Sequence, residues 1–109
     1  MQINWSEPSR DDLREIVSYV GNSFGQRKAK EVLAEIRNSA ELLKNFPFLG
    51  KKFVKDEELQ IEYRTLPSEL NQLIYYVDED TITIVTVWQN RRDINRLKKK
   101  LSKGYGLEE

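Results

Sequence analysis

The spacing of apolar residues changes at about Leu59 in this chain of 109 residues. Before that point apolar side chains recur three or four residues apart, from Leu59 to Trp88 they alternate with polar ones, and after Asn90 the first spacing returns. The first spacing is typical of a helix with one buried face, and the second is typical of a half-buried strand. The sequence therefore predicts an α+β fold in which the helices come first and most of the sheet second.

Two helices are predicted in the first half, after a short strand at residues 2–5. The first helix carries one apolar stripe, formed by Leu13, Ile16, Val17 and Val20. Gly21-Asn22, with Gly25 close behind, predicts a break before a second helix over residues 26–44. Because the connection is short, the two helices should form an antiparallel hairpin.

Three strands are predicted in the second half. Alternation places them at residues 59–64, 72–77 and 81–88, with turns at residues 67–69 and 78–80. Consecutive strands joined by short turns pair antiparallel, so these strands should form a meander. The segment before them, which contains Phe48, Lys51, Lys52 and Phe53, is predicted to be a loop ordered by its aromatic residues.

A last helix is predicted over residues 94–103, because Ile94, Leu97 and Leu101 are spaced for one helix face. Residues 104–109 follow it as a loose tail. The predicted order is β-α-α-β-β-β-α, a helical hairpin packed on a small antiparallel sheet. Residues 1–109 are expected to form a single domain, since compact domains cluster at this length.

The composition excludes several kinds of chemistry. The chain has no cysteine, which rules out disulfides and thiolate metal sites, and no histidine, the commonest general base and metal ligand. No glycine-rich phosphate loop and no metal-ligand spacing occurs, so neither a metal site nor a cofactor is expected. Eighteen basic residues balance eighteen acidic ones, and any nucleic-acid site would therefore have to be a local patch.

The N-terminal residues lack the basic and apolar runs of a signal peptide. No stretch approaches the length of apolar residues that spans a bilayer. A cytoplasmic protein without a membrane partner is therefore expected.

The best candidate site is a basic corner where the last strand ends. Trp88, Arg91 and Arg92 lie there together, and Asp93 is placed to cap the final helix. Arginine offers a planar fork of donors that suits phosphate or carboxylate, and Arg64 could point to the same side of the sheet. Alternatively, these arginines only neutralise nearby acidic side chains.

The final helix carries further cations, namely Arg96, Lys98, Lys99, Lys100 and Lys103. This helix could dock an acidic partner or nucleic acid, or it could be a solvated helix held by its apolar seam. The aromatic residues of the strands also leave two possibilities open. Tyr63, Tyr75, Tyr76 and Trp88 could form a stacking platform or could belong to the core.

Several segments in this order resemble the RelE/ParE superfamily of bacterial toxins. They are Trp5-Ser6, the run from Asp12 to Ile16, a second long helix, the run from Tyr75 to Asp78, and the run from Val87 to Asp93. The resemblance extends from about Ile3 to Asp93, and its order and spacing are more specific than any single segment. Members are the toxin halves of type II toxin–antitoxin systems, often described as plasmid stabilisation proteins. The resemblance implies growth inhibition that a tightly bound antitoxin neutralises.

Departures from the RelE pattern decide which branch is expected. RelE-like toxins cleave mRNA on the ribosome with basic residues on their strands, but this chain has Gln60, Glu62 and Gln72 at about those places. Gln89 stands where other ribonuclease members carry a histidine, and glutamine exchanges no proton near neutral pH. Glu62 would repel a phosphate. A catalytic role is therefore not expected of this chain.

The resemblance thus favours the ParE-like branch, whose members are known for poisoning DNA gyrase. On this interpretation Arg64, Trp88, Arg91, Arg92, Arg96 and Lys99 contact the target or the antitoxin. A RelE-like ribonuclease with an atypical site, using Arg64 and Arg91 on ribosome-bound mRNA, is the first alternative. A non-toxic binding module is the second.

Overall fold

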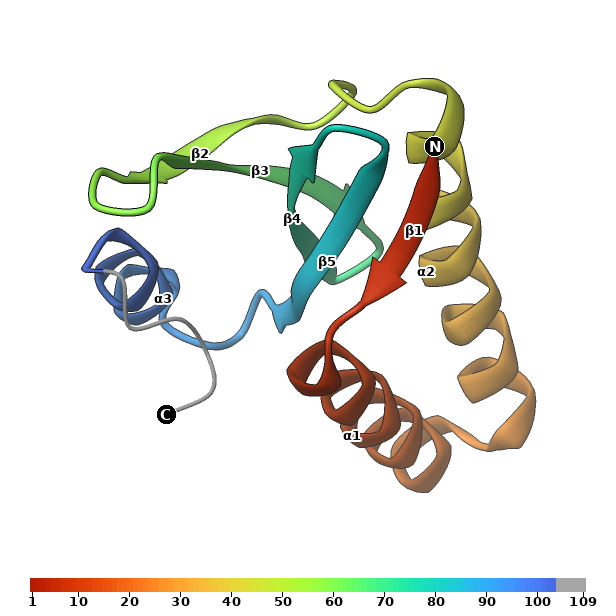
Figure 1. Ribbon diagram of the computed structural model, residues 1–109. Coiled ribbons are helices and arrows are strands. Elements are labelled where there is room, and N and C mark those ends of the chain that lie inside the picture. Colours follow the sequence, from red (N-terminus) through yellow and green to blue (C-terminus); the bar gives the residue numbers. More distant parts are fainter. Residues whose placement is uncertain (104–109) are drawn as a thin grey trace.

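The computed structural model describes residues 1–103 of the chain (Figure 1). It confirms an α+β fold and adds one strand to the prediction. The elements are β1 (Gln2–Trp5), α1 (Glu7–Phe24), α2 (Gln26–Asn45), β2 (Lys51–Asp56), β3 (Ile61–Ser68), β4 (Asn71–Asp78), β5 (Thr81–Gln89) and α3 (Ile94–Ser102).

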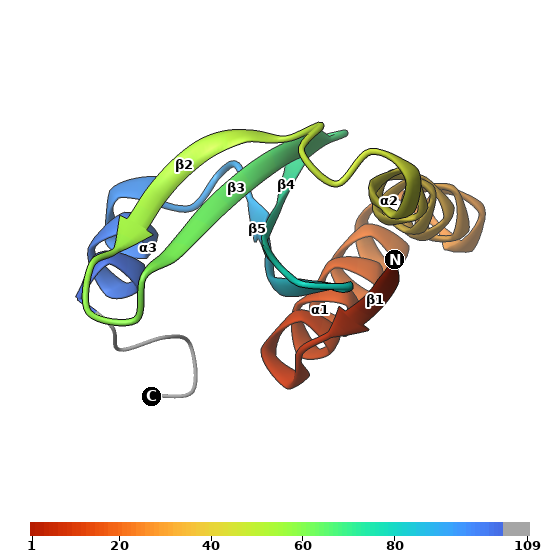
Figure 2. The ribbon, with the colours of Figure 1, turned by 45° about the horizontal axis from the view of Figure 1, so that its top comes forward.

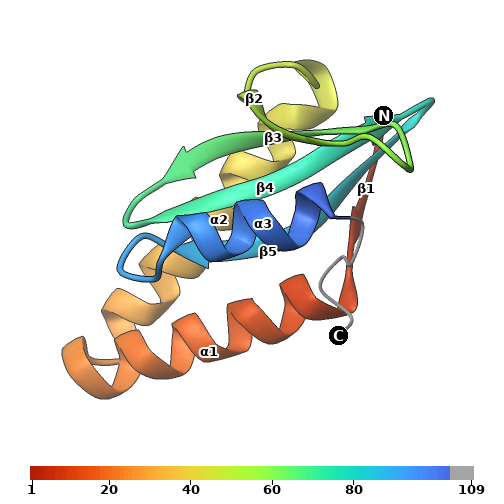
Figure 3. The same ribbon diagram turned by 90° about the vertical axis from the view of Figure 1, so that its left-hand side faces the viewer.

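All five strands form one sheet with the order β1-β5-β4-β3-β2. The four later strands make an antiparallel meander, and β1 joins β5 in parallel at the far edge. The hairpin of α1 and α2 covers one face, while α3 lies on the other (Figures 2 and 3). The sheet is therefore the middle layer of the molecule.

Two apolar clusters hold these layers together. On the hairpin side, Ile16, Ile36 and Leu43 pack against the sheet residues Tyr75 and Ile84. On the α3 side, the cluster consists of Tyr63, Ile74, Trp88, Leu97 and Leu101, with smaller contributions from partly buried neighbours. Alternate strand residues thus serve opposite clusters, as the period of two requires.

The prediction of a loop after α2 is wrong for the second part of that segment, because residues 51–56 form the edge strand β2. Two features hide this strand in the sequence. A bulge between Lys52 and Val54 interrupts the alternation. Its exposed lysines are typical of an edge strand that is protected against further pairing.

Two boundaries of β3 also differ from the prediction. The strand begins at Ile61, because Leu59 lies in the preceding turn, and it continues through Pro67 and Ser68, which were expected in a turn. The turn instead lies at residues 69–70, where Glu69 has a φ of 56°. Pairing with β2 reaches only Thr65, so Pro67 lies on a free edge where its missing N–H can be tolerated.

The helical break lies at Gly25, not at Gly21-Asn22. Helix α1 continues to Phe24, and Gly25 has φ 94° and ψ 166°, a conformation that is nearly exclusive to glycine. The loose tail predicted at residues 104–109 lies outside the described residues. Among residues 1–103, no helix combines the length and apolar character needed to cross a membrane.

Replacing Gly25 with alanine should lower the free energy of unfolding by about 1–3 kcal/mol, because the backbone conformation is strained for any residue with a Cβ. No neighbouring atom lies within 4 Å of the added Cβ, so the cost comes from the backbone alone. Urea denaturation of the purified variant measures it.

Gly21→Ala is the matched control. Its Cβ would meet Gln26 Nε2 at 3.5 Å and Ala29 Cβ at 3.8 Å, which are ordinary contacts. Since Gly21 is helical, alanine should stabilise the protein by about 0.5–1 kcal/mol. Equal losses from both substitutions would contradict this account of the break.

Candidate functional site

The free edge of β5 begins where β1 ends, and side chains of the first helix cover it. β1 pairs with β5 only as far as Ile84. The Ser6 hydroxyl then donates to the Val85 carbonyl at 2.8 Å, and the Ser6 oxygen also accepts from the Ser9 amide at the start of α1. Ser6 therefore ends the pairing with β5 and caps α1 at the same time.

Asp12, in the second turn of α1, continues this cover. Its Oδ2 atom accepts hydrogen bonds from the Thr86 hydroxyl and from the Val87 amide, the latter at 3.0 Å. Without the carboxylate, that backbone N–H would have no partner at the sheet edge. Asp12 thus fixes the N-terminal part of α1 beside the end of β5.

Asp93 caps helix α3, and its side chain accepts a hydrogen bond from the Asn95 amide at 3.0 Å. This confirms the predicted cap. Leu97 and Leu101 are fully buried against the sheet. The residues at Arg96, Lys99, Lys100 and Lys103 are spaced i, i+3, i+4 and i+7, so they share one helix face. We call these four residues the cationic stripe.

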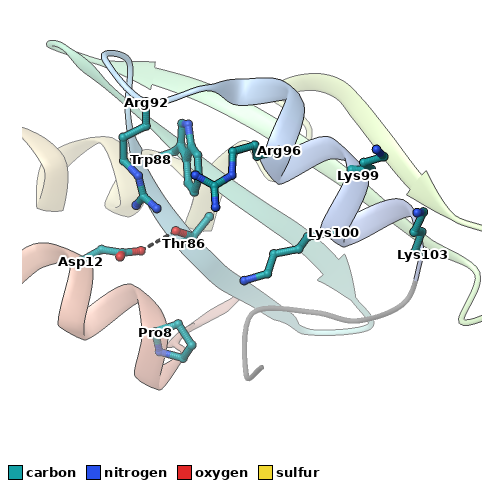
Figure 4. Close-up of a pocket in the computed structure, with 9 residues that line it drawn as sticks. All are labelled: Pro8, Asp12, Thr86, Trp88, Arg92, Arg96, Lys99, Lys100 and Lys103. Carbon is teal, nitrogen blue, oxygen red and sulfur yellow. Dashed lines mark hydrogen bonds between the residues drawn. The ribbon is translucent and has the colours of Figure 1, made fainter.

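A cavity of about 400 Å³ separates the cationic stripe from α1 (Figure 4). Arg96 and Lys100 extend from α3 toward α1, and Lys99 and Lys103 lie farther out along the helix. The described residues that line it are Pro8, Asp12, Thr86, Trp88, Arg92, Arg96, Lys99, Lys100 and Lys103. Five of these residues are cationic, and Asp12 carries the one carboxylate among them.

Burial raises the pKa of the Asp12 carboxyl above its ordinary value of 3.8. The hydrogen bonds from Thr86 and Val87 and the positive charge of Arg92 each lower this pKa, but less strongly. The guanidinium of Arg92 also stacks on Trp88, with its central carbon 3.9 Å from the ring centroid. Arg92 thus stacks on the aromatic wall of the cavity, and its charge acts on the Asp12 carboxylate without an ion-pair contact.

Of the six residues predicted to contact the target or the antitoxin, four line this cavity: Trp88, Arg92, Arg96 and Lys99. Arg91 does not; it stacks on Tyr19 of α1 at 4.5 Å, and its Nε donates to Gln89 at 2.8 Å. The two arginines of the predicted basic corner therefore stack on different aromatic residues, Arg91 on Tyr19 and Arg92 on Trp88. Within the described residues, neither Arg91 nor Arg92 forms an ion pair within 4.0 Å.

Arg64 lies away from the other candidates. It donates to the Gly50 carbonyl at 2.7 Å and stacks on Phe48 at 4.8 Å, at the connection between α2 and β2. It lines a different cavity, together with Glu62 and Asp78. The structure thus gives Arg64 a role in ordering this connection and does not bring it to the cationic stripe.

The strand aromatics belong mainly to the core. Tyr63 and Tyr75 are buried and Trp88 is only 7% exposed, while Tyr76 is partly buried in edge-to-face contact with Tyr63. Of the two possibilities left open by the sequence, the core is the observed one for these residues.

Sequence reasoning missed Asp12 and Thr86 as parts of this site. In the sequence Asp12 stood out only as part of the run that resembles the toxin superfamily, and Thr86 only as a position in the predicted strand at residues 81–88. Their contact joins positions 74 residues apart, and no local pattern signals it. Among residues 1–103, no group of three or more acidic side chains is placed to hold a metal ion.

The positions that depart from the RelE pattern are engaged in structural contacts. Gln72 accepts from the Thr65 hydroxyl at 2.6 Å and donates to Asn90 at 3.1 Å. Gln89 is buried and accepts from Arg91. Among the described residues, the site thus offers cations and hydrogen-bond donors that can bind a ligand. Oδ2 of Asp12 already accepts hydrogen bonds from Thr86 and Val87.

A helical hairpin on one face of a mixed sheet, with a short helix on the other, is the architecture of RelE/ParE-like toxins. The sequence matches, over residues 3–94, the family model described as the ParE toxin of the type II toxin–antitoxin system parDE. The chain belongs to this ParE toxin family.

A solved structure titled "Chromosomal ParDE TA system from P. aeruginosa" has the same fold, with a TM-score of 0.67. The match covers 82% of this chain and 95% of the other at 21% sequence identity. A comparison with curated proteins found no match.

Asp12→Ala should lower the free energy of unfolding by about 1–3 kcal/mol, because the Thr86 hydroxyl and the Val87 amide lose their common acceptor. Asp12→Asn should cost under about 1 kcal/mol, since one amide oxygen can accept both bonds. Urea denaturation at neutral pH compares the two variants. Equal losses would show that the charge, and not the acceptor, holds α1 in place.

The same pair tests the direction of the pKa shift. A raised pKa means that the folded chain binds this proton more tightly than the unfolded chain. The stability of the native chain relative to Asp12→Asn should therefore fall as the pH rises from 3.8 through the raised pKa. Denaturation at several pH values between 4 and 7 measures the difference, and a rise across this window would contradict the shift.

Proposed function

We propose that this chain is a type II toxin that inhibits bacterial growth by binding an essential protein target, with DNA gyrase as the first candidate. In this proposal a cognate antitoxin neutralises it, and both partners meet it in the cytoplasm. The observation that carries the proposal is the family match over residues 3–94. The fold shared with a ParDE system supports the same class of protein.

The cavity beside the cationic stripe supports binding over cleavage. Cleaving RNA requires a group that takes a proton from the ribose hydroxyl. Asp12, the one carboxylate among the described residues that line the cavity, accepts two structural hydrogen bonds through Oδ2, and the chain has no histidine. A lining dominated by cations is suited to binding an anionic surface.

In this proposal the partner contacts are Trp88, Arg92, Arg96 and Lys99 at the cavity, with Arg91 on the adjoining surface. Arg64 contributes indirectly by ordering the connection through Phe48 and Gly50.

One observation favours a RelE-like ribonuclease as second candidate. Lys52 is the cross-strand partner of Arg64, so two cations lie close together on β2 and β3. Glu62 lies 4.0 Å from Lys52 and weakens their combined positive field. If this site cleaves mRNA on ribosomes, Arg64→Ala should abolish the cleavage. Absence of cleavage by the native protein would remove this candidate.

Induced expression in bacteria that lack an antitoxin should arrest growth and produce signs of DNA damage. Purified protein should then inhibit supercoiling by purified gyrase, whereas ribosome-dependent mRNA cleavage should be absent. Co-expression of the neighbouring antitoxin gene should restore growth. Normal growth despite abundant folded protein would contradict the toxin proposal, and growth arrest with fully active gyrase would contradict gyrase as the target.

A further inference from the structure

The cationic stripe collects like charges on one helix face. Pairs of cations three or four residues apart repel each other by a few tenths of a kcal/mol. The four ion pairs among the described residues all lie elsewhere, so none relieves the stripe. Lys99 and Lys100 gain some stability from the C-terminal end of the helix dipole, but Arg96 lies in the first turn, where a cation is disfavoured. The arrangement is therefore poorly explained by the stability of α3 alone.

We propose that the cavity between α1 and the cationic stripe binds an acidic polypeptide segment of the partner. The identity of that partner as antitoxin or target rests on the proposed function, whereas the binding chemistry rests on the cavity. Arginine and lysine form charge-assisted hydrogen bonds with carboxylates, and complementary charge speeds association and selects partners. Pro8 and Trp88 add an apolar part to the lining, so the segment carries an apolar side chain among its carboxylates.

Two observations favour a polypeptide over nucleic acid. Binding of single strands usually needs an exposed aromatic face for stacking, but Arg92 covers Trp88, which is only 7% exposed. The chain also has zero formal net charge, so long-range attraction of a nucleic acid is weak.

The length of the stripe limits the size of the segment. Lys103 lies seven positions after Arg96, which corresponds to about 10 Å along a helix. About three extended residues, or about two turns of helix, cover this distance. The cavity volume of about 400 Å³ is within the range of sites that hold a few side chains. The contact is therefore with a short acidic segment.

The experiment compares two probes that carry the same net charge. One is a short fluorescein-labelled peptide of glutamate and leucine residues, and the other is a labelled single-stranded DNA oligonucleotide. Fluorescence anisotropy with the purified full chain should show the peptide binding more tightly. The variant Arg96→Gln/Lys99→Gln/Lys103→Gln should weaken peptide binding by about tenfold, since each exposed pair contributes modestly.

The matched control removes the same charge from α2, with Arg27→Gln/Lys30→Gln/Arg37→Gln. These residues are also exposed and helical, and glutamine has a similar helix propensity to lysine and arginine. Peptide affinity should change by less than about twofold. An equal loss in the control, no binding of the peptide, or tighter binding of the DNA would each overturn the proposal.

Growth arrest separates this inference from the proposed function. A toxic protein that ignores the acidic peptide would refute the binding site and leave the toxin proposal intact. A protein that does not arrest growth but binds the peptide through the cationic stripe would support the binding site and refute the toxin proposal. Circular dichroism and urea denaturation of both triple variants confirm that they are folded before the affinities are compared.

Discussion

The contact between Asp12 and the end of β5 determines how the two halves of this protein meet. β1 protects only the first part of β5, and a buried backbone N–H beyond it needs an acceptor. Asp12 supplies that acceptor from α1, so the helical hairpin is fixed at the sheet edge as well as on the sheet face. Burial makes the charge less favourable, as its raised pKa indicates, yet the same carboxylate offsets the charge of Arg92. One wall of the cavity therefore depends on an interaction that first serves the fold.

The opposite wall depends on α3, which performs two separate tasks with its two faces. Leu97 and Leu101 are buried against the sheet, and the cationic stripe is turned toward the cavity. The position of α3 is fixed by apolar packing and by the Asp93 cap. Among the described residues, the cations of the stripe are therefore not needed to hold the helix in place. This division explains why its cations can be replaced with little expected effect on folding, whereas Asp12 cannot be truncated without cost.

The sequence predicted the layers of the fold better than the site. Strong helical periodicity marked both long helices and α3, because each of these helices presents one buried face. Apolar residues alternating along the chain marked β4 and β5, which lie between the two apolar clusters. β2 was not predicted, because lysines and a bulge obscure the alternation of this edge strand. Trp88, Arg92, Arg96 and Lys99 were found as a local cluster of charge beside an aromatic residue. Asp12 was missed and Arg64 was grouped with the wrong neighbours, since both depend on contacts between distant segments.

The two candidate locations on this protein differ in how their polar groups are used. At the second candidate location, Arg64 is committed to the Gly50 carbonyl, and Glu62 opposes the cations around it. At the first, five cations line the cavity, and Asp12, the one carboxylate among the described lining residues, accepts hydrogen bonds from Thr86 and Val87 through Oδ2. The bonds that position α1 thus also fix the carboxylate that lies opposite these cations.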